Sequence, residues 1–211
     1  MLDSFLFDAE VEYLETSANS GTYLRLPVNV FGVGKHMSFT LDVQYLDTLR
    51  GSITTQLEGF GYSYSYGSAS AYLYACINGQ TSEQGTSAFG VGMPSSYFNF
   101  GTEDTSRHTF GANTARATAY FDGNGMTKYG TEKKIRMRNF GLFCVCEEDG
   151  SVLHVCSLPV RLFSFKLTVD TSQMFNMIPV RKGNTGFLYN KVNGQLYGKE
   201  GGADFIVGQD K

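Results

Sequence analysis

The fold class is decided by a stretch in which polar and apolar residues alternate without a break, Ser38-Phe39-Thr40-Leu41-Asp42-Val43-Gln44-Tyr45. Successive side chains of a β-strand point to opposite faces, so this order places four large apolar side chains on one face and four polar ones on the other. We therefore expect a half-buried strand here, packed against a second layer of structure.

The same period of two recurs along most of the chain, whereas helical periodicity is almost absent. It is clear at residues Leu162–Val169 and Ala117–Phe121. Turn signals stand between such segments, at Asn78-Gly79, Asp122-Gly123 and Glu147–Gly150. The pattern predicts roughly a dozen or more short strands in an all-β, antiparallel β-sandwich, with a jelly roll as the favoured topology.

Composition argues against several classes of protein. The chain has 211 residues, 18% of them charged, and a net charge of −3, so it can bury a core of its own and is not a charge-driven disordered chain. The acidic balance disfavours a nucleic-acid partner, and no apolar run approaches the ~20 residues that cross a bilayer. Residues 1–8 lack a basic segment, so we expect no signal peptide and no membrane insertion. No linker divides the chain, which predicts a single domain over residues 1–211.

Cysteine and histidine positions give no pattern typical of a metal or cofactor site. Cys76, Cys144, Cys146 and Cys156 lack a standard zinc spacing, and we interpret them as buried free thiols. A disulfide from Cys156 to Cys144 or Cys146 is the alternative. The three histidines are scattered and have no nucleophile beside them in a catalytic pattern. We predict neither a metal nor a cofactor.

The most distinctive segment is a row of tyrosines, Tyr62, Tyr64 and Tyr66, separated by serines. If the segment is extended, the three rings share one face. Tyrosine combines a large rigid surface with a polar tip, which suits stacking on sugar rings or on a protein surface. We predict these three residues as the binding site, with packing into the core or a subunit interface as an equally strong alternative.

Two charged segments carry weaker functional hypotheses. Lys133-Lys134-Ile135-Arg136-Met137-Arg138 alternates so that Lys134, Arg136 and Arg138 share a strand face, which could contact an anionic glycan or phosphate. The favoured interpretation is an exposed strand that charge protects from aggregation. Glu103-Asp104 could contribute to a calcium site, but two adjacent acids favour a solvated turn.

Several stretches resemble one known family. They are Glu12–Glu15 with Gly21–Leu24, Tyr120–Gly123, and above all Arg161–Leu167, Ile178–Lys182, Gly186–Gly198 and Phe205–Gly208. In this order they resemble concanavalin A-like (laminin-G-like) jelly rolls of gut-bacterial and bacteriophage structural proteins. The chain departs from the family pattern at Asn190, where the family usually has Asp, and in the unusually aromatic segment at residues 59–72.

The resemblance also bears on Glu10, Glu12 and Glu15, because glycoside hydrolases of this fold carry a related E-x-D-x-x-E strand motif. Paired carboxylates about 5–5.5 Å apart suit a retaining glycosidase. Here the central residue is Glu, Glu15 has the opposite strand parity, and no Trp is available to line a sugar cleft. We therefore expect solvent-facing charges and no enzymatic activity.

The resemblance implies a non-catalytic carbohydrate- or surface-binding virion protein, such as a phage tail or capsid-decorating subunit that recognises host glycans. One alternative is a purely structural virion subunit that packs against other capsid or tail proteins. A second is a lectin-like protein, secreted by or on the surface of a gut bacterium. We expect a homo-oligomer located in the virion, or at the bacterial surface or outside the cell under the second alternative.

Overall fold

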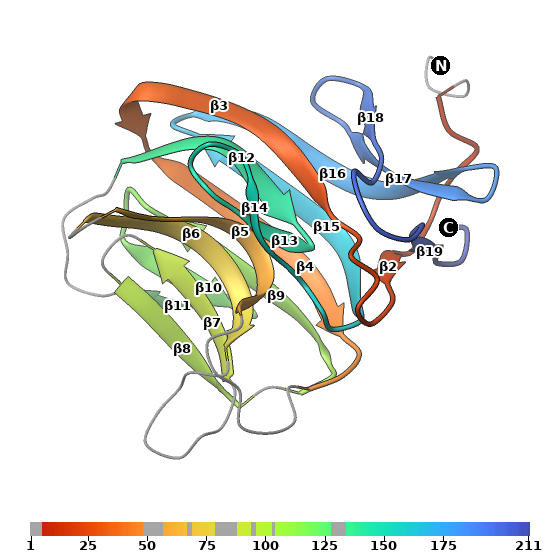
Figure 1. Cartoon of the computed structure of the whole chain (residues 1–211), viewed down its shortest axis with the longest axis horizontal. Coiled ribbons are helices and arrows are strands. Elements are labelled where there is room, and N and C mark those ends of the chain that lie inside the picture. Colours follow the sequence, from red (N-terminus) through yellow and green to blue (C-terminus); the bar gives the residue numbers. More distant parts are fainter. Residues whose placement is uncertain are drawn as a thin grey trace.

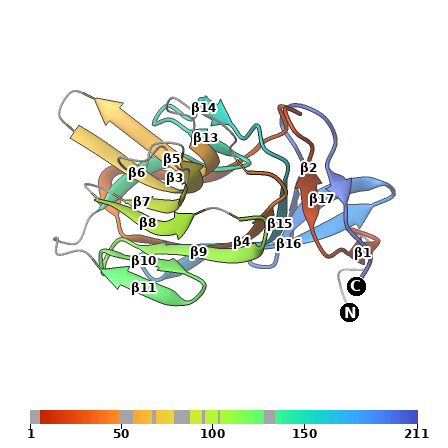
Figure 2. The same ribbon diagram turned by 90° about the horizontal axis from the view of Figure 1, so that it is seen from below.

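The computed structural model describes residues 6–48, 57–66, 69–78, 88–93, 96–102, 104–127 and 134–211. These residues form strands, turns and loops, and they include no helix that could span a membrane. Two sheets pack face to face (Figures 1 and 2). The predicted all-β, antiparallel β-sandwich is confirmed.

The larger sheet has eleven strands. Its main order is β11 (Asn124–Thr127), β10 (Thr118–Phe121), β9 (Arg107–Asn113), β4 (Met37–Tyr45), β15 (Val160–Val169), β16 (Ser172–Lys182), β17 (Thr185–Asn190) and β18 (Gln195–Tyr197). Three short strands join its side: β1 (Ala9–Glu10) pairs with β16, while β2 (Leu14–Thr16) pairs with β15 and β19 (Ile206–Val207).

The smaller sheet has eight strands. Its order is β14 (Val152–Val155), β13 (Cys144–Cys146), β5 (Leu57–Tyr66), β6 (Ala69–Asn78), β7 (Ala88–Met93) and β8 (Ser96–Thr102). β12 (Ile135–Leu142) pairs with β3 (Leu24–Lys35) and with β5. All described pairs in the two sheets are antiparallel except β5 with β13.

Alternation in β4 follows the prediction residue by residue. Phe39, Leu41, Val43 and Tyr45 are buried, and the residues between them are half-buried or exposed. The predicted turn at Asp122-Gly123 connects β10 to β11, and both residues have positive φ angles, +47° and +78°. The Glu147–Gly150 turn likewise connects β13 to β14. The Asn78-Gly79 turn lies outside the described residues at Gly79.

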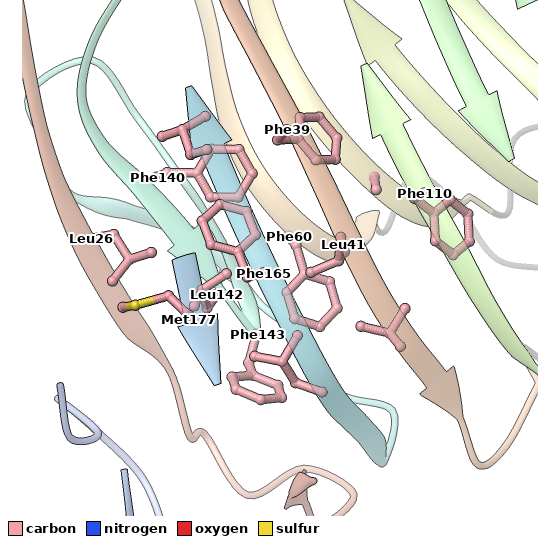
Figure 3. Close-up of a cluster of buried hydrophobic side chains, with 14 of the residues drawn as sticks. Leu26, Phe39, Leu41, Phe60, Phe110, Phe140, Leu142, Phe143, Phe165 and Met177 are labelled. Carbon is pink, nitrogen blue, oxygen red and sulfur yellow. The ribbon is translucent and has the colours of Figure 1, made fainter. Parts of the chain in front are cut away.

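Aromatic side chains join the two sheets. Phe140 of β12 has its ring centroid 5.5 Å from that of Phe39 on β4 and 4.9 Å from that of Phe165 on β15 (Figure 3). All four cysteines are buried free thiols, as predicted, so the alternative of a disulfide is wrong. The core therefore depends on hydrophobic packing between the inner faces.

Asn190, where the chain departs from the family pattern, is fully buried at the end of β17. Its carbonyl oxygen accepts hydrogen bonds from the N–H groups of Asn176 and Val192, at 3.0 and 3.1 Å. Its amide nitrogen donates to the carbonyl of Met174 at 3.1 Å. A carboxylate can accept but cannot donate, so only the amide satisfies all three partners.

Asn190→Asp should lower the free energy of unfolding by about 1–3 kcal/mol, because it leaves the Met174 carbonyl unpaired and buries a charge. Urea denaturation at neutral pH measures the change. Asn193→Asp, at an exposed position three residues away, is the matched control and should change it little. Equal stability of Asn190→Asp and the unmodified protein would contradict this interpretation.

Candidate functional site

The outer face of the larger sheet carries the most developed candidate site. Because Phe39 and Leu41 of β4 point into the core, Thr40 and Asp42 point outward. On β9 the neighbouring outward positions are Thr109, opposite Asp42, and Gly111, opposite Thr40. This face is rich in short hydroxyl-bearing side chains, which can donate and accept hydrogen bonds.

A bulge in β15 places an aromatic ring on the same face. The register between β15 and β4 shifts between Leu162 and Ser164, so that Phe163 is the extra residue. The guanidinium of Arg107 lies 3.8 Å from the centroid of the Phe163 ring, and the Tyr13 ring packs edge-on at 5.7 Å. Arg161 lies 4.2 Å from the Tyr13 ring centroid. We call these four residues the stacked row.

The stacked row is electrically balanced by carboxylates. Arg107 donates two hydrogen bonds to Asp42, at 2.7 and 2.6 Å, and Arg161 donates one to Glu15 at 2.7 Å. The hydrogen bonds from Arg107 to Asp42 raise the pKa of the guanidinium above its usual range. Each of these two arginines therefore has a carboxylate of its own. Lys166, a third cation of this face, is exposed opposite Thr40 in the register of β15 with β4.

Beyond Asp42, the face is hollowed by about 200 Å³. The hollow is lined by Thr40, Thr109, Phe110, Gly111, Tyr120 and Gly123. Its floor exists because Gly111 has no side chain: a Cβ there would lie 3.0 Å from the Phe39 carbonyl oxygen and 3.5 Å from the Tyr120 Cβ. Tyr120 is half-buried, and β10 pairs it with Gly111 on one side and with Gly125 on the other.

The turn beside the hollow is held by a histidine with two acidic partners. Asp122 accepts a hydrogen bond from the Thr109 N–H at 2.8 Å and lies 2.7 Å from His108 Nδ1. The other ring nitrogen of His108, Nε2, lies 3.0 Å from Asp104. The His108 ring packs against Phe121 and Phe89, with centroids 4.7 and 4.9 Å away.

Burial of the His108 ring disfavours its charged form, but hydrogen bonds to Asp122 and Asp104 outweigh this and raise its pKa. Asp104 is thus engaged by His108 and by the Ser106 N–H rather than facing solvent alone. The described residues contain no group of three side chains able to hold a metal ion. Glu103, the other half of the calcium hypothesis, lies outside them.

Tyr62, the first residue of the predicted tyrosine row, lies apart from this site. Tyr62 on β5 is 1% exposed and packs in the core, so its ring is not available to a ligand. For Tyr62 the structure supports the core alternative, because β5 lies inside the smaller sheet with its inner face on the larger one. The side chains of Tyr64 and Tyr66 lie outside the described residues, and their part of the hypothesis stays a prediction.

The glutamate string is split by the fold. Glu10 lies on β1 and Glu15 on β2, which pair with different strands. Glu15 is bound to Arg161, Glu10 lies 3.7 Å from the Lys191 ammonium, and Glu12 is exposed. The string therefore does not gather its three carboxylates on one strand face.

The structure contains a buried carboxylate that the sequence analysis did not predict as a site, that of Glu58 on β5. Glu58 is 0% exposed and accepts hydrogen bonds from the Ser157 hydroxyl at 2.7 Å and from the N–H groups of Ser157 and Leu158. His154 Nε2 lies 3.3 Å from the same carboxylate. Burial raises the pKa of Glu58, but hydrogen bonds from His154 and Ser157 outweigh it and lower the pKa to about 2.

This cluster resembles a nucleophilic site in composition only. Burial raises the pKa of the Cys156 thiol well above its usual value, so the sulfur stays protonated at neutral pH. The Ser157 hydroxyl donates a hydrogen bond to the Glu58 carboxylate, which is a weak base because its pKa is lowered to about 2. The arrangement anchors residues 157–158 to β5.

A second hollow, of about 220 Å³, lies at the end of the larger sheet that carries β17 and β18. It is lined by Thr185, Gly186, Phe187, Gly198, Lys199, Asp204 and Phe205. Lys199 lies 3.2 Å from Asp204 and donates to the Gly202 carbonyl at 2.7 Å. Its charged groups thus satisfy one another, which makes it the weaker candidate.

Comparison of the chain with protein families, with curated proteins and with solved structures finds no match.

Glu58→Gln should destabilise the fold at pH 7 by up to about 3 kcal/mol, since the pKa falls from 4.5 to about 2 on folding. A depressed carboxyl pKa stabilises the protein above pH 4.5, and the effect disappears as the pH falls toward 2. Denaturation at several pH values measures the difference between the two proteins. A difference that is the same at pH 2.5 and pH 7 would argue against an ionised Glu58.

His108→Gln should reduce the loss of stability that occurs as the pH is raised above neutrality. A raised histidine pKa stabilises the fold fully below the unfolded value of ~6.5, and this contribution is lost as the pH rises through the folded value. Melting temperatures from pH 6 to pH 9 should therefore decline more for the unmodified protein than for His108→Gln. His36→Gln serves as the control, and parallel curves for the unmodified protein and His108→Gln would refute the prediction.

Proposed function

We propose that this protein is a non-catalytic carbohydrate-binding β-sandwich that holds a neutral sugar in the hollow beside Tyr120. The observation that supports this proposal best is that the Tyr120 ring lies beside a hollow in which Gly111 leaves space by having no side chain. A half-buried aromatic ring next to a shallow depression offers an apolar face to a sugar ring. Thr40 and Thr109 offer hydroxyls at its margin.

The paired charges of the stacked row support a neutral ligand on this face. Arg107 and Arg161 are neutralised by Asp42 and Glu15, so an anionic sugar would find no free cation in the stacked row. The stacked row extends the face beyond the hollow with two further rings, Tyr13 and Phe163. A chain of several sugar units could thus contact both parts of the same sheet.

The proposal that the protein acts in a virion is based on the sequence resemblance. Concanavalin A-like jelly rolls occur in phage and gut-bacterial structural proteins, which supports a virion subunit that meets host glycans. A homo-oligomer would multiply weak single sites by avidity. The structural virion subunit is the function that remains if no glycan binds.

A glycan array containing capsule and cell-wall polysaccharides tests the proposal with the full chain in its native oligomeric state. Tyr120→Ala should lower the affinity for the recognised glycan at least tenfold, because it removes the stacking surface. Tyr120→Phe should retain most of the binding, since the ring remains. Thr40→Val should weaken it severalfold by removing one hydroxyl.

Thr168→Val on β15 is the matched control, an outward-facing threonine of the same sheet that does not line the hollow. It should bind as the unmodified protein does. Because Tyr120 also covers Gly111 and Gly125, the melting temperature of each variant is measured alongside. Absence of binding by the folded protein, or binding that survives Tyr120→Ala, would overturn the proposal.

A further inference from the structure

The basic cluster lies on the outer face of the smaller sheet, away from the hollow. Burial alternates over residues 134–138: Ile135 and Met137 are at most 1% exposed, and Lys134, Arg136 and Arg138 are exposed. Residues two apart on a strand are ~6.6 Å apart, so the three cations form a straight row along β12 and the residue before it.

The charges of this row are largely unpaired. No ion pair or hydrogen bond of Lys134 or Arg136 is found among the described residues. Arg138 donates to the backbone carbonyl of Asp149 at 3.0 Å, and hydrogen bonds from Ser151 together with the charge of Arg138 lower the pKa of the Asp149 carboxyl. Arg25, Arg107, Arg161 and Arg181, in contrast, each lie within 2.7 Å of a carboxylate. Lys134 and Arg136 are thus two exposed cations without a partner among the described residues, on a chain of net charge −3.

Apolar side chains stand beside the row because β3 is looped out there. Ile135 pairs with Lys35 and Met137 with Val30, so four residues of β3 face the single Arg136. Positive φ angles at Asn29 (+55°) and Gly32 (+69°) let the chain leave the sheet. The excursion exposes Phe31 to 59% and Val33 to 78%. Arg138 lies 5.7 Å from the Phe31 ring centroid.

We propose that Lys134, Arg136, Arg138 and the looped-out Phe31 and Val33 form a second binding site, which takes a linear acidic polysaccharide. The cations would pair with carboxylate or sulfate groups along the polymer, and the apolar side chains would contact the less polar faces of the sugar rings. A straight row of charges fits a linear polymer lying along β12. Polyphosphate is a less suitable ligand than an acidic polysaccharide, because it has no apolar face that could contact Phe31 and Val33.

This site is separate from the hollow, since it lies on the other sheet and selects charge instead of neutrality. The test measures binding of the full chain to immobilised polygalacturonate, which carries carboxylates, and to dextran sulfate, which carries sulfates. Neutral dextran is the control polymer. Binding to either acidic polymer and not to dextran supports the site, and the stronger of the two identifies the anionic group. The affinity should fall steeply as NaCl is raised.

Arg136→Ser should weaken this binding at least fivefold and make the salt dependence shallower, because one ionic contact is lost. Phe31→Ser should weaken it severalfold and leave the salt dependence unchanged. Lys166→Ser, an exposed cation on the larger sheet, is the matched control and should bind normally. Tyr120→Ala should also bind normally, so failure of the neutral-sugar hollow and failure of this site are told apart.

Three results would overturn the inference. The first is an affinity for the acidic polymers that Arg136→Ser and Arg138→Ser leave unchanged in folded protein. The second is equal binding of polyphosphate with no effect of Phe31→Ser, which would make the row a nonspecific ion exchanger. The third is binding to vesicles of phosphatidylserine and phosphatidylcholine without binding to either polymer, which would indicate a lipid surface.

Discussion

Phe140 is the side chain on which the sandwich most visibly depends. It projects from β12 of the smaller sheet and contacts Phe39 and Phe165 on two adjacent strands of the larger one. Because this contact joins the inner faces, the residues that alternate with core residues in β4 and over Ile135–Arg138 point outward. The hydroxyls of the larger sheet and the cations of the smaller one are exposed for the same reason. Both proposed sites are thus consequences of how the core is packed.

The positions of several strands could be predicted from the local sequence pattern, because the residues of a half-buried strand alternate between apolar and polar. Phe39 to Tyr45 and Ile135 to Arg138 show this directly, and both alternations are confirmed. The turn at Asp122-Gly123 was equally predictable, since both residues tolerate the positive φ angles it needs. Which face of β5 points inward was not predictable, because Tyr62 suits either a core or a binding surface.

The candidate site depends on pairing register, which a single sequence does not carry. Thr40, Gly111 and Tyr120 are separate positions in the sequence and line one hollow only because β4, β9 and β10 align them. Phe163 reaches the outer face through a bulge that shifts the β15 register. Glu58 pairs with residues 157–158 across almost a hundred positions. Contacts between residues far apart in the sequence form these sites, and local sequence patterns do not predict such contacts.

The outer faces of the two sheets differ in whether their arginines are paired with carboxylates. On the larger sheet Arg107 and Arg161 are committed to carboxylates and to aromatic rings, so they stiffen the surface and add little net charge. On the smaller sheet Arg136 has no carboxylate partner within the part of the chain that the structure describes, and we propose that its charge selects an anion. Under the two proposals together, the protein would bind a neutral sugar on one sheet and an acidic polysaccharide on the other. The two sheets would then contact different parts of a mixed polysaccharide coat, with neither contact displacing the other.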